Sequence, residues 1–285
     1  MPSLTFDFWI IIAGILVAIP CAILGSLLTL KKSVMVADAI SHAVLPGIVI
    51  SFLIVNSLSS VWLLFGASLV GLFSTILIEF LRQKVKIQND ASIGITFTWL
   101  FAIGVILISL FANNVDLDLD CVLFGQIEYV PLNEFLRISG YPILPLSIAP
   151  LLIISIITCL LIIVFYKELK TAIFDEDYAK AIGLPSNFLH YGIMALLSMT
   201  CVAAFESVGA ILVIAFIAIP AATAFLFSKQ MNIMIILSIV ISIVGVITGT
   251  IGSNIGQGLS SSGVIVICLG LIFVCSILSK RFLKF

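Results

Sequence analysis

The chain has 285 residues, of which 62% are hydrophobic and only 9% are charged. A soluble domain of this length needs much more polar surface, so the composition excludes that class and indicates an integral membrane protein. The formal net charge of −1 gives no support to nucleic acid or an anionic surface as a partner.

Apolar runs long enough to cross a bilayer recur along the whole chain. Backbone groups in lipid must be hydrogen-bonded within their own segment, and the runs do not alternate as barrel strands do, so we expect an all-α, polytopic protein. The run at 191–228 is too long for one helix and carries Glu206 near its middle, so we divide it between Phe205 and Glu206. The predicted spans, eight to nine in number, are 8–30, 34–56, 60–81, 91–112, 143–166, 191–205, 206–228, 231–251 and 263–279.

The basic residues predict the orientation of these spans. If nine segments cross, every lysine and arginine except Arg137 falls on one side of the membrane. Basic residues concentrate in cytoplasmic loops, so we expect a bacterial cell membrane protein with its N-terminus outside and its C-terminus in the cytoplasm. The residues on the predicted cytoplasmic side are Lys31, Lys32, Arg82, Lys84, Lys86, Lys167, Lys170, Lys180, Lys229, Lys280, Arg281 and Lys284.

Two loops stand out between the spans. The loop at 113–142, predicted to lie outside, carries the sequence DLDLD at 116–120 together with Glu128 and Glu134. It is interpreted as a solvated acidic loop, with attraction of cations or docking of a binding protein as alternatives. The loop at 167–190, predicted to lie inside, contains a short helix that begins at Asp175 and ends at Gly183 and Pro185.

Asp38 and His42 are the clearest functional candidates, because ionisable side chains inside a span are costly. They are four residues apart, so one helical face presents both. A carboxylate oxygen and an imidazole nitrogen suit Mn²⁺, Fe²⁺ or Zn²⁺, although one of each is only half of a coordination shell. A two-fold dimer with this helix on its axis would supply two of each. The alternative is a buried Asp–His pair that only ties two helices together.

Several other residues in or near the spans are polar or break helices. Pro46 and the glycine after it follow one turn later and can break the helix beside the Asp–His pair. Glu206 either hydrogen-bonds backbone at a helix break or has a gating role, and Ser41 and Pro46 are further candidates for a supporting or gating role. Glu79 lies near a span end and can reach the interface, and His190 is interpreted as an interfacial histidine rather than a ligand.

Other motifs narrow the range of functions. The six cysteines show no CxxC spacing and lie mostly in apolar runs, where they behave as small hydrophobic residues. The sequence has no GxxxxGK(S/T) motif, so we expect no ATP binding through a P-loop. It also lacks HExxH and GxSxG, which disfavours a protease or hydrolase.

Four stretches, in order along the chain, are similar to the permease subunits of the ABC importers for manganese, zinc and iron. KKSVMVADAISHAVLPGIVISF at 31–52 resembles the family's basic pair followed by Asp-Ala-x-Ser-His-Ala-x-Leu-Pro-Gly. DLDCVLFGQI at 118–127 resembles its Asp-Leu-x-x-x-Leu-Phe-Gly element, and DEDYAKAIGLP at 175–185 resembles its ATPase-docking segment. VGAILVIAFIAIPAATAFL at 208–226 resembles the helix that contains Ile-Pro-Ala-Ala-Thr-Ala.

This resemblance implies a permease that acts as a dimer, with itself or a homologous permease. Each copy would contact one ATPase subunit, and an extracytoplasmic solute-binding protein would deliver the metal. Asp38 and His42 match the family's pore aspartate and histidine. The family often has Leu-Asp-Leu-Pro-x-Gly-Pro near its last span, whereas this chain reads GQGLSSSGV at 256–264, so a role for that loop is not carried over. The residues expected to dock on the ATPase, within a segment at about 167–190, are Tyr178, Ala179, Ala181, Gly183, Leu184 and Pro185.

We therefore expect a single transmembrane permease domain over residues 1–285 of an ATP-driven importer of divalent Mn, Zn or Fe. The chain itself would not be an enzyme and would hold no permanently bound cofactor, because the metal is its cargo. One alternative is a secondary metal transporter driven by an ion gradient, which would be expected to show more intramembrane carboxylates and a clear repeat pair. The other is a non-transporting membrane scaffold or intramembrane enzyme, in which Asp38 and His42 would be dispensable for metal accumulation.

Overall fold

A computed structural model of the chain describes residues 2–55, 60–111, 127–132, 135–138, 141–145, 148–254 and 260–282. The acidic stretch at 116–120, Glu134 and the first part of the loop at 256–264 lie outside the described residues. Glu206 is described as part of a helix, but its side chain is not among the described ones. The described part of the chain is almost entirely helical, which confirms the predicted all-α class.

Among the described residues, the helices are accompanied by one 3₁₀ helix (η1) and one small hairpin. The elements of the first half are α1 (Pro2–Leu30), α2 (Met35–Ala43), α3 (Leu45–Val55), α4 (Ser60–Gln83), α5 (Asn89–Phe111), η1 (Ile127–Leu132), β1 (Phe135–Ile138) and β2 (Tyr141–Pro145). Those of the second half are α7 (Ile148–Val164), α8 (Tyr166–Phe174), α9 (Glu176–Ala181), α10 (Ser186–Val208), α11 (Ala210–Phe227), α12 (Met231–Ser253) and α13 (Ser261–Phe282).

Eight helical segments of the described chain, α2 and α3 counted together, are long and apolar enough to cross a membrane. The number becomes nine if α7 and α8, which meet at a bend of 71°, form one broken span. The predicted eight to nine spans are therefore confirmed.

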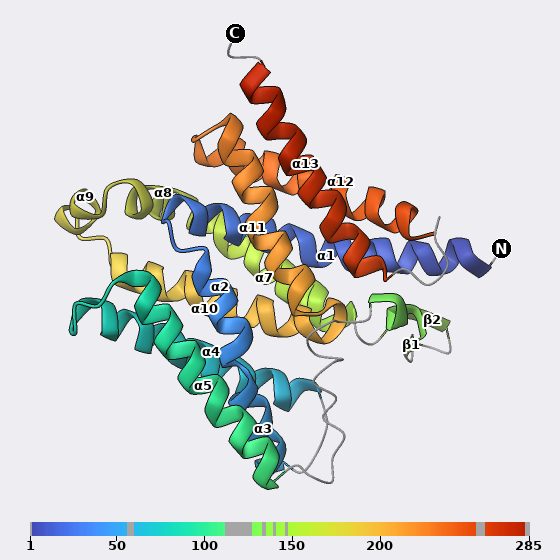
Figure 1. Ribbon diagram of the computed structural model, residues 1–285, viewed down its shortest axis with the longest axis horizontal. Coiled ribbons are helices and arrows are strands. Elements are labelled where there is room, and N and C mark those ends of the chain that lie inside the picture. Colours follow the sequence, from blue (N-terminus) through green and yellow to red (C-terminus); the bar gives the residue numbers. More distant parts are fainter. Residues whose placement is uncertain are drawn as a thin grey trace.

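Helix α1 is the buried centre of the bundle (Figure 1). Its span is 72% buried, whereas the spans of α5 and α13 are each 22% buried and face outward. A Cβ atom on Gly25 of α1 would lie 2.1 Å from the carbonyl oxygen of Ile217 in α11. Only glycine permits this approach of two backbones, which is how helices pack closely where lipid removes the hydrophobic driving force.

The second span is broken between α2 and α3, at Val44. Pro46 has no N–H, so the carbonyl of His42 cannot receive the usual helical bond from the residue four positions later. Gly47 then lets α3 lie against α4, because a Cβ atom there would come within 2.6 Å of the carbonyl oxygen of Gly66. The predicted helix break beside the Asp38–His42 pair is therefore present as a one-residue interruption at Val44, whose φ of −71° and ψ of −25° stay helical.

Two predicted boundaries are wrong. The long run at 191–228 divides at Gly209, with φ 82° and ψ 157°, and not between Phe205 and Glu206. Glycine adopts a positive φ without steric cost, whereas hydropathy and the charge of Glu206 carry no information on φ. The span predicted at 143–166 starts too early, because Tyr141–Pro145 forms β2 and the helix begins at Ile148. A short apolar run does not distinguish a strand from a helix.

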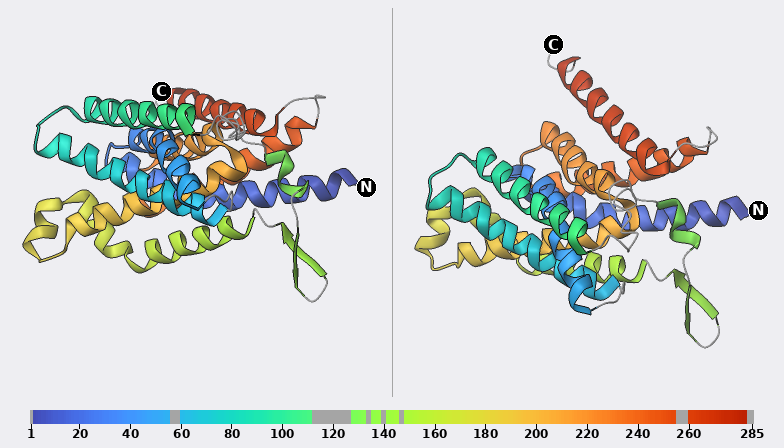
Figure 2. Two further views of the ribbon diagram at one scale, coloured as in Figure 1. Left: turned by 90° about the horizontal axis from the view of Figure 1, so that it is seen from below. Right: turned by 60° about the horizontal axis from the view of Figure 1, so that its bottom comes forward.

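The antiparallel β1–β2 hairpin projects from the helical bundle near the end where the N-terminus lies (Figure 2). At this end the amide of Asn254, after α12, donates to Asp7 of α1 at 2.9 Å, and the backbone N–H of Ser261 donates to Glu128 of η1. The α8–α9 segment lies at the opposite end of the bundle (Figure 1). The two ends of the bundle are thus built from different sets of loops.

Candidate metal site and a polar cluster around Glu79

Asp38 and His42 lie on one face of α2, as their spacing predicts. His42 Nε2 is 3.7 Å from Asp38 Oδ1, and the side chains are 34% and 45% exposed. With ligand distances of about 2.1 Å, one ion can contact both atoms. Among the residues that the structure describes, no group of three or more His, Cys, Asp or Glu side chains is placed to hold a metal. Within the described residues, a single chain therefore offers two half-exposed candidate ligands.

The rest of α2 and its neighbours fix the position of this pair. The His42 ring contacts two rings of α5, with centroid distances of 5.8 Å to Phe97 and 6.1 Å to Phe101. Ile40, between the two ligands in sequence, is fully buried on the opposite face of α2. It lies near Gly71 of α4, where an added Cβ atom would be 3.4 Å from Ile40 Cγ2. The carboxylate and the imidazole thus project from a helix whose apolar side is anchored.

The three residues predicted to support or gate the site have different surroundings. The hydroxyl of Ser41 donates to the carbonyl of Ala37 at 2.9 Å, within α2. Pro46 is buried, and a Cβ atom on Gly104 of α5 would come within 3.0 Å of its Cδ. Glu206 belongs to α10, near the helix break at Gly209, and the described residues do not test a role for its side chain.

The predicted docking segment has the helix limits that its sequence indicates. Asp175 caps α9, because its carboxylate accepts from the backbone N–H of Tyr178 at 2.9 Å. Gly183 ends the turn with φ 80°, and Pro185 precedes α10. Among the six residues expected to dock, Tyr178, Ala181, Gly183 and Pro185 are exposed, Leu184 is half-buried and Ala179 is fully buried.

A polar cluster around one buried carboxylate was missed by the sequence analysis. Glu79 was expected to reach the interface, but it is only 6% exposed. Both of its oxygens have partners: Oε1 accepts from Arg82 Nη2 at 2.6 Å and from the amide of Gln83, and Oε2 lies 3.7 Å from His190 Nε2. His190 lies 111 positions further along the chain, so no local pattern could have predicted the contact.

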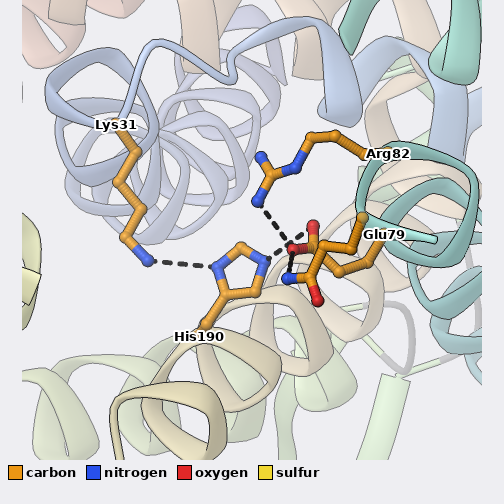
Figure 3. A network of polar contacts seen from close by, with 5 residues as sticks. Lys31, Glu79, Arg82 and His190 are labelled. Atoms are coloured by element: carbon orange, nitrogen blue, oxygen red, sulfur yellow. Dashed lines mark hydrogen bonds and ion pairs between the residues drawn. The ribbon is translucent and has the colours of Figure 1, made fainter. Parts of the chain in front are cut away.

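The histidine connects this carboxylate to a third helix (Figure 3). Lys31 Nζ, just after α1, is 3.1 Å from His190 Nδ1. An ammonium group only donates, so Nδ1 accepts, and the proton of the neutral ring is then on Nε2, which faces Glu79. The Glu79 cluster, defined as Lys31, Glu79, Arg82, Gln83 and His190, thus joins the ends of α1 and α4 to the start of α10.

Comparison with known proteins identifies the family of the chain. Residues 3–280 match the ABC 3 transport family. The chain belongs to the ABC 3 transport family. This membership, over nearly the full length, confirms the family resemblance of the four sequence stretches.

Named relatives of the ABC 3 transport family are similar over most of the chain. The manganese transport system membrane protein MntD of Bacillus subtilis (strain 168) is 43% identical over 235 residues, which cover 82% of this chain and 79% of that protein. The zinc transport system membrane protein TroD of Treponema pallidum (strain Nichols) is 39% identical over 212 residues, covering 74% and 57%. The chelated iron transport system membrane protein YfeD of Yersinia pestis is 34% identical over 231 residues, covering 80% and 70%.

A solved structure has the same fold. The structure of PsaBC from Streptococcus pneumoniae in complex with Fab superposes with a TM-score of 0.78 at 32% identity, over 98% of this chain and 94% of that chain. This agreement supports the helix order and packing described for this ABC 3 family member.

Proposed function

We propose that this chain is the membrane-spanning permease subunit of an ATP-driven importer of divalent transition-metal ions, Mn, Zn or Fe. The observation that carries the proposal is the Asp38–His42 pair, two half-exposed oxygen and nitrogen ligands 3.7 Å apart on a membrane-spanning helix of an ABC 3 family member. The names of relatives as manganese, zinc and chelated-iron transport proteins support the class of cargo. The ion is the cargo, and the chain would hold no permanent cofactor.

A second copy of the chain, or a homologous permease, would complete the site. Two ligands replace too little of the hydration shell of a dication, whereas a two-fold axis beside α2 would bring two carboxylates and two imidazoles together. The exposure of both side chains in the single chain is compatible with such an arrangement. Oxygen and nitrogen ligands without thiolate also favour release, which transport requires as much as binding.

The remaining partners follow from the same assignment. We place the N-terminus outside and the C-terminus in the cytoplasm of a bacterial cell membrane, so that the basic helix ends are cytoplasmic. The whole chain then forms one permease domain, and its segment at about 167–190 docks on a separate ATPase subunit. Four exposed residues of this segment (Tyr178, Ala181, Gly183 and Pro185) support a docking role. A solute-binding protein would deliver the metal at the opposite face.

The test is uptake by the complete complex in liposomes, with the ATPase inside and the binding protein outside. We expect Mn²⁺ uptake to need ATP, and to fall by about tenfold or more in Asp38→Ala and His42→Ala, because each change removes two of four ligands from a dimer. Met35→Ala, at the 64% exposed first residue of α2, is the control, because it changes the same helix and removes no candidate ligand. Wild-type uptake by a folded Asp38→Ala, His42→Ala double variant would end the proposal, and uptake driven by an ion gradient without ATP would favour a secondary transporter.

A further inference from the structure

We infer that the Glu79 cluster links the segment at 175–185 to the metal-binding helix α2, with Glu79 and His190 as positioning residues for transport. This inference rests on the proposed function. It concerns residues outside the candidate metal site, which act on Asp38 and His42 through the backbone that carries them. The link has three parts: the contact between α10 and the α1–α2 turn, the contact between α10 and α4, and the packing of α2 against both.

The cluster lies between the two segments that it would connect. His190 is five residues after Pro185, in the second turn of α10, so displacement of the docking segment acts directly on its position. Lys31 opens the turn between α1 and α2, and this turn is short and fixed, with Lys32 at φ 56° and the Ser33 N–H bonded to the carbonyl of Leu28 at 3.0 Å. A displacement of Lys31 therefore also displaces the start of α2.

A second contact lies deeper along the same helices. The hydroxyl of Ser198 in α10 donates to the carbonyl of Ser68 in α4 at 3.1 Å and is buried. A Cβ atom on Gly71 would be 2.0 Å from this hydroxyl oxygen and 3.4 Å from Ile40 of α2, so the three helices meet here without space between them. The Glu79 cluster joins these helices near their ends, and the Ser198–Ser68 contact joins them deeper in the bundle. Helices α10, α4 and α2 can therefore move together but cannot slide freely past one another.

The bonding of Glu79 makes the interhelical contact reversible. A buried carboxylate that loses its partners is strongly destabilising. Glu79 has two partners on its own helix, Arg82 and Gln83, and one on α10, His190. Glu79 therefore stays compensated within α4 when His190 moves away, so the contact between the helices can open and close at low cost. An apolar contact of the same size would have to expose its surface on opening.

The two nitrogen atoms of the His190 ring contact groups on two different helices. Nδ1 accepts from Lys31 while Nε2 faces Glu79, so one ring holds an ammonium on α1 and a carboxylate on α4 at the same time. A glutamine at this position can also accept through its amide oxygen and donate through its amide nitrogen, whereas leucine can do neither. This difference separates the polar link from simple filling of space.

The experiment uses the full complex with its ATPase and binding protein in liposomes. The variants are Glu79→Gln, His190→Leu and His190→Gln, and the control is Lys84→Gln, which removes a nearby exposed cation outside the cluster. The first measurement is the number of Mn²⁺ ions imported per ATP hydrolysed. The second is the ATP-dependent change in reactivity of Met35→Cys, the 64% exposed first residue of α2, in a background without the native cysteines.

We expect Glu79→Gln and His190→Leu to keep ATP hydrolysis but to lower import per ATP by about fivefold or more, and to lose the ATP-dependent change at position 35. His190→Gln and Lys84→Gln should keep both. Unchanged import per ATP in folded Glu79→Gln and His190→Leu would overturn the inference, as would equal losses in His190→Leu and His190→Gln. If His190→Leu does not assemble, Lys31→Met at a half-exposed position gives the same test, with the same loss expected.

Failure of the inference is separable from failure of the proposed function. Wild-type complex that hydrolyses ATP without importing metal would contradict the proposed function before any variant is compared. The labelling at position 35 needs no metal, so it reports the link whatever the cargo is. Metal import by the wild type with identical labelling changes in all variants would leave the function standing and remove the link.

Discussion

We expect the charge of Asp38, more than its shape, to decide which ions the proposed metal site can hold. A dication that leaves water loses hydration free energy, and neutral ligands in a low-dielectric path restore only part of it. Two carboxylates from two copies of the chain would balance the charge of one ion. The side chain of Asp38 is half-exposed in the single chain.

The variant Asp38→Asn separates charge from shape. It keeps the volume and one oxygen ligand, and we expect its Mn²⁺ uptake in liposomes to lie within about twofold of the Asp38→Ala level. Met35→Gln, at an exposed position on the same helix, is the control for a polar change that removes no ligand. Uptake by Asp38→Asn close to that of the wild type would show that the carboxylate charge is not needed.

The orientation of the His42 ring depends on side chains of another helix, α5. The rings of Phe97 and Phe101 in α5 lie against the imidazole and restrict its orientation. The i, i+4 spacing places His42 on the same face as Asp38, but the distance of 3.7 Å between their ligand atoms also requires the ring to be held. The second requirement is a property of the packing between α2 and α5.

At the scale of single elements, α9 shows how one short helix divides its residues between two tasks. Ala179 is fully buried, and its backbone carbonyl accepts from the N–H of Leu184 at 2.9 Å, so it holds the turn together. Ala181 and Tyr178 are exposed and available to a partner. Ala179 therefore supports the docking segment from inside, and a bulky residue there would disturb the segment itself.

Replacement of Ala181 tests docking on the ATPase. Ala181→Trp adds a large side chain to an exposed position, so we expect the permease to fold normally while its binding to the ATPase weakens by about tenfold or more. Val85→Trp, at a 53% exposed position between α4 and α5 and outside the segment at 167–190, is the matched control. Pull-down of the ATPase and the melting temperature of the permease in detergent separate the two effects. Normal ATPase binding by Ala181→Trp would argue against this docking surface.

On the scale of the whole molecule, polar contacts join helix ends at both ends of the bundle. Lys31, Glu79 and His190 join α1, α4 and α10, and Lys280 of α13 donates to the carbonyl of Leu226 in α11. At the other end, Asp7 and Glu128 accept from groups next to α12 and α13. Basic groups dominate the first set, and a bias of Lys and Arg toward one side is what orients membrane proteins, whereas acidic residues contribute little to orientation.

The predicted orientation can be tested by labelling single cysteines in intact cells, in a background that lacks the six native ones. We expect cysteines at positions 84, 180 and 280 to be protected from a membrane-impermeant reagent, and one at position 254 to react, because the basic ends are cytoplasmic. Permeabilised cells provide the control for reactivity. Reaction at position 180 in intact cells, with protection at position 254, would invert the topology.

The sequence by itself determined the class of protein, a span count of eight to nine, the limits of the short helix α9 and the shared face of Asp38 and His42. These properties are local: hydropathy is summed over one span, a cap acts over three residues, and an i, i+4 pair shares one helical face. The position of Gly209 as a helix break is also encoded locally, but in backbone conformation, which hydropathy does not measure. The boundary was therefore wrong by a few residues, whereas the existence of the break was right.

Only the tertiary structure decided the environment of the polar residues. From the sequence, Glu79 was expected to reach the interface, because its own helix ends four residues later. In the structure, α10 covers Glu79 and supplies His190 as its partner. Likewise, the spacing of Asp38 and His42 does not reveal that α5 orients the imidazole, or that Ile40 is anchored near Gly71. Glu79 and His190 are more than a hundred positions apart, His42 and its two phenylalanines more than fifty, and Ile40 and Gly71 about thirty. Lipid-facing helices give no polar pattern that would indicate which faces meet.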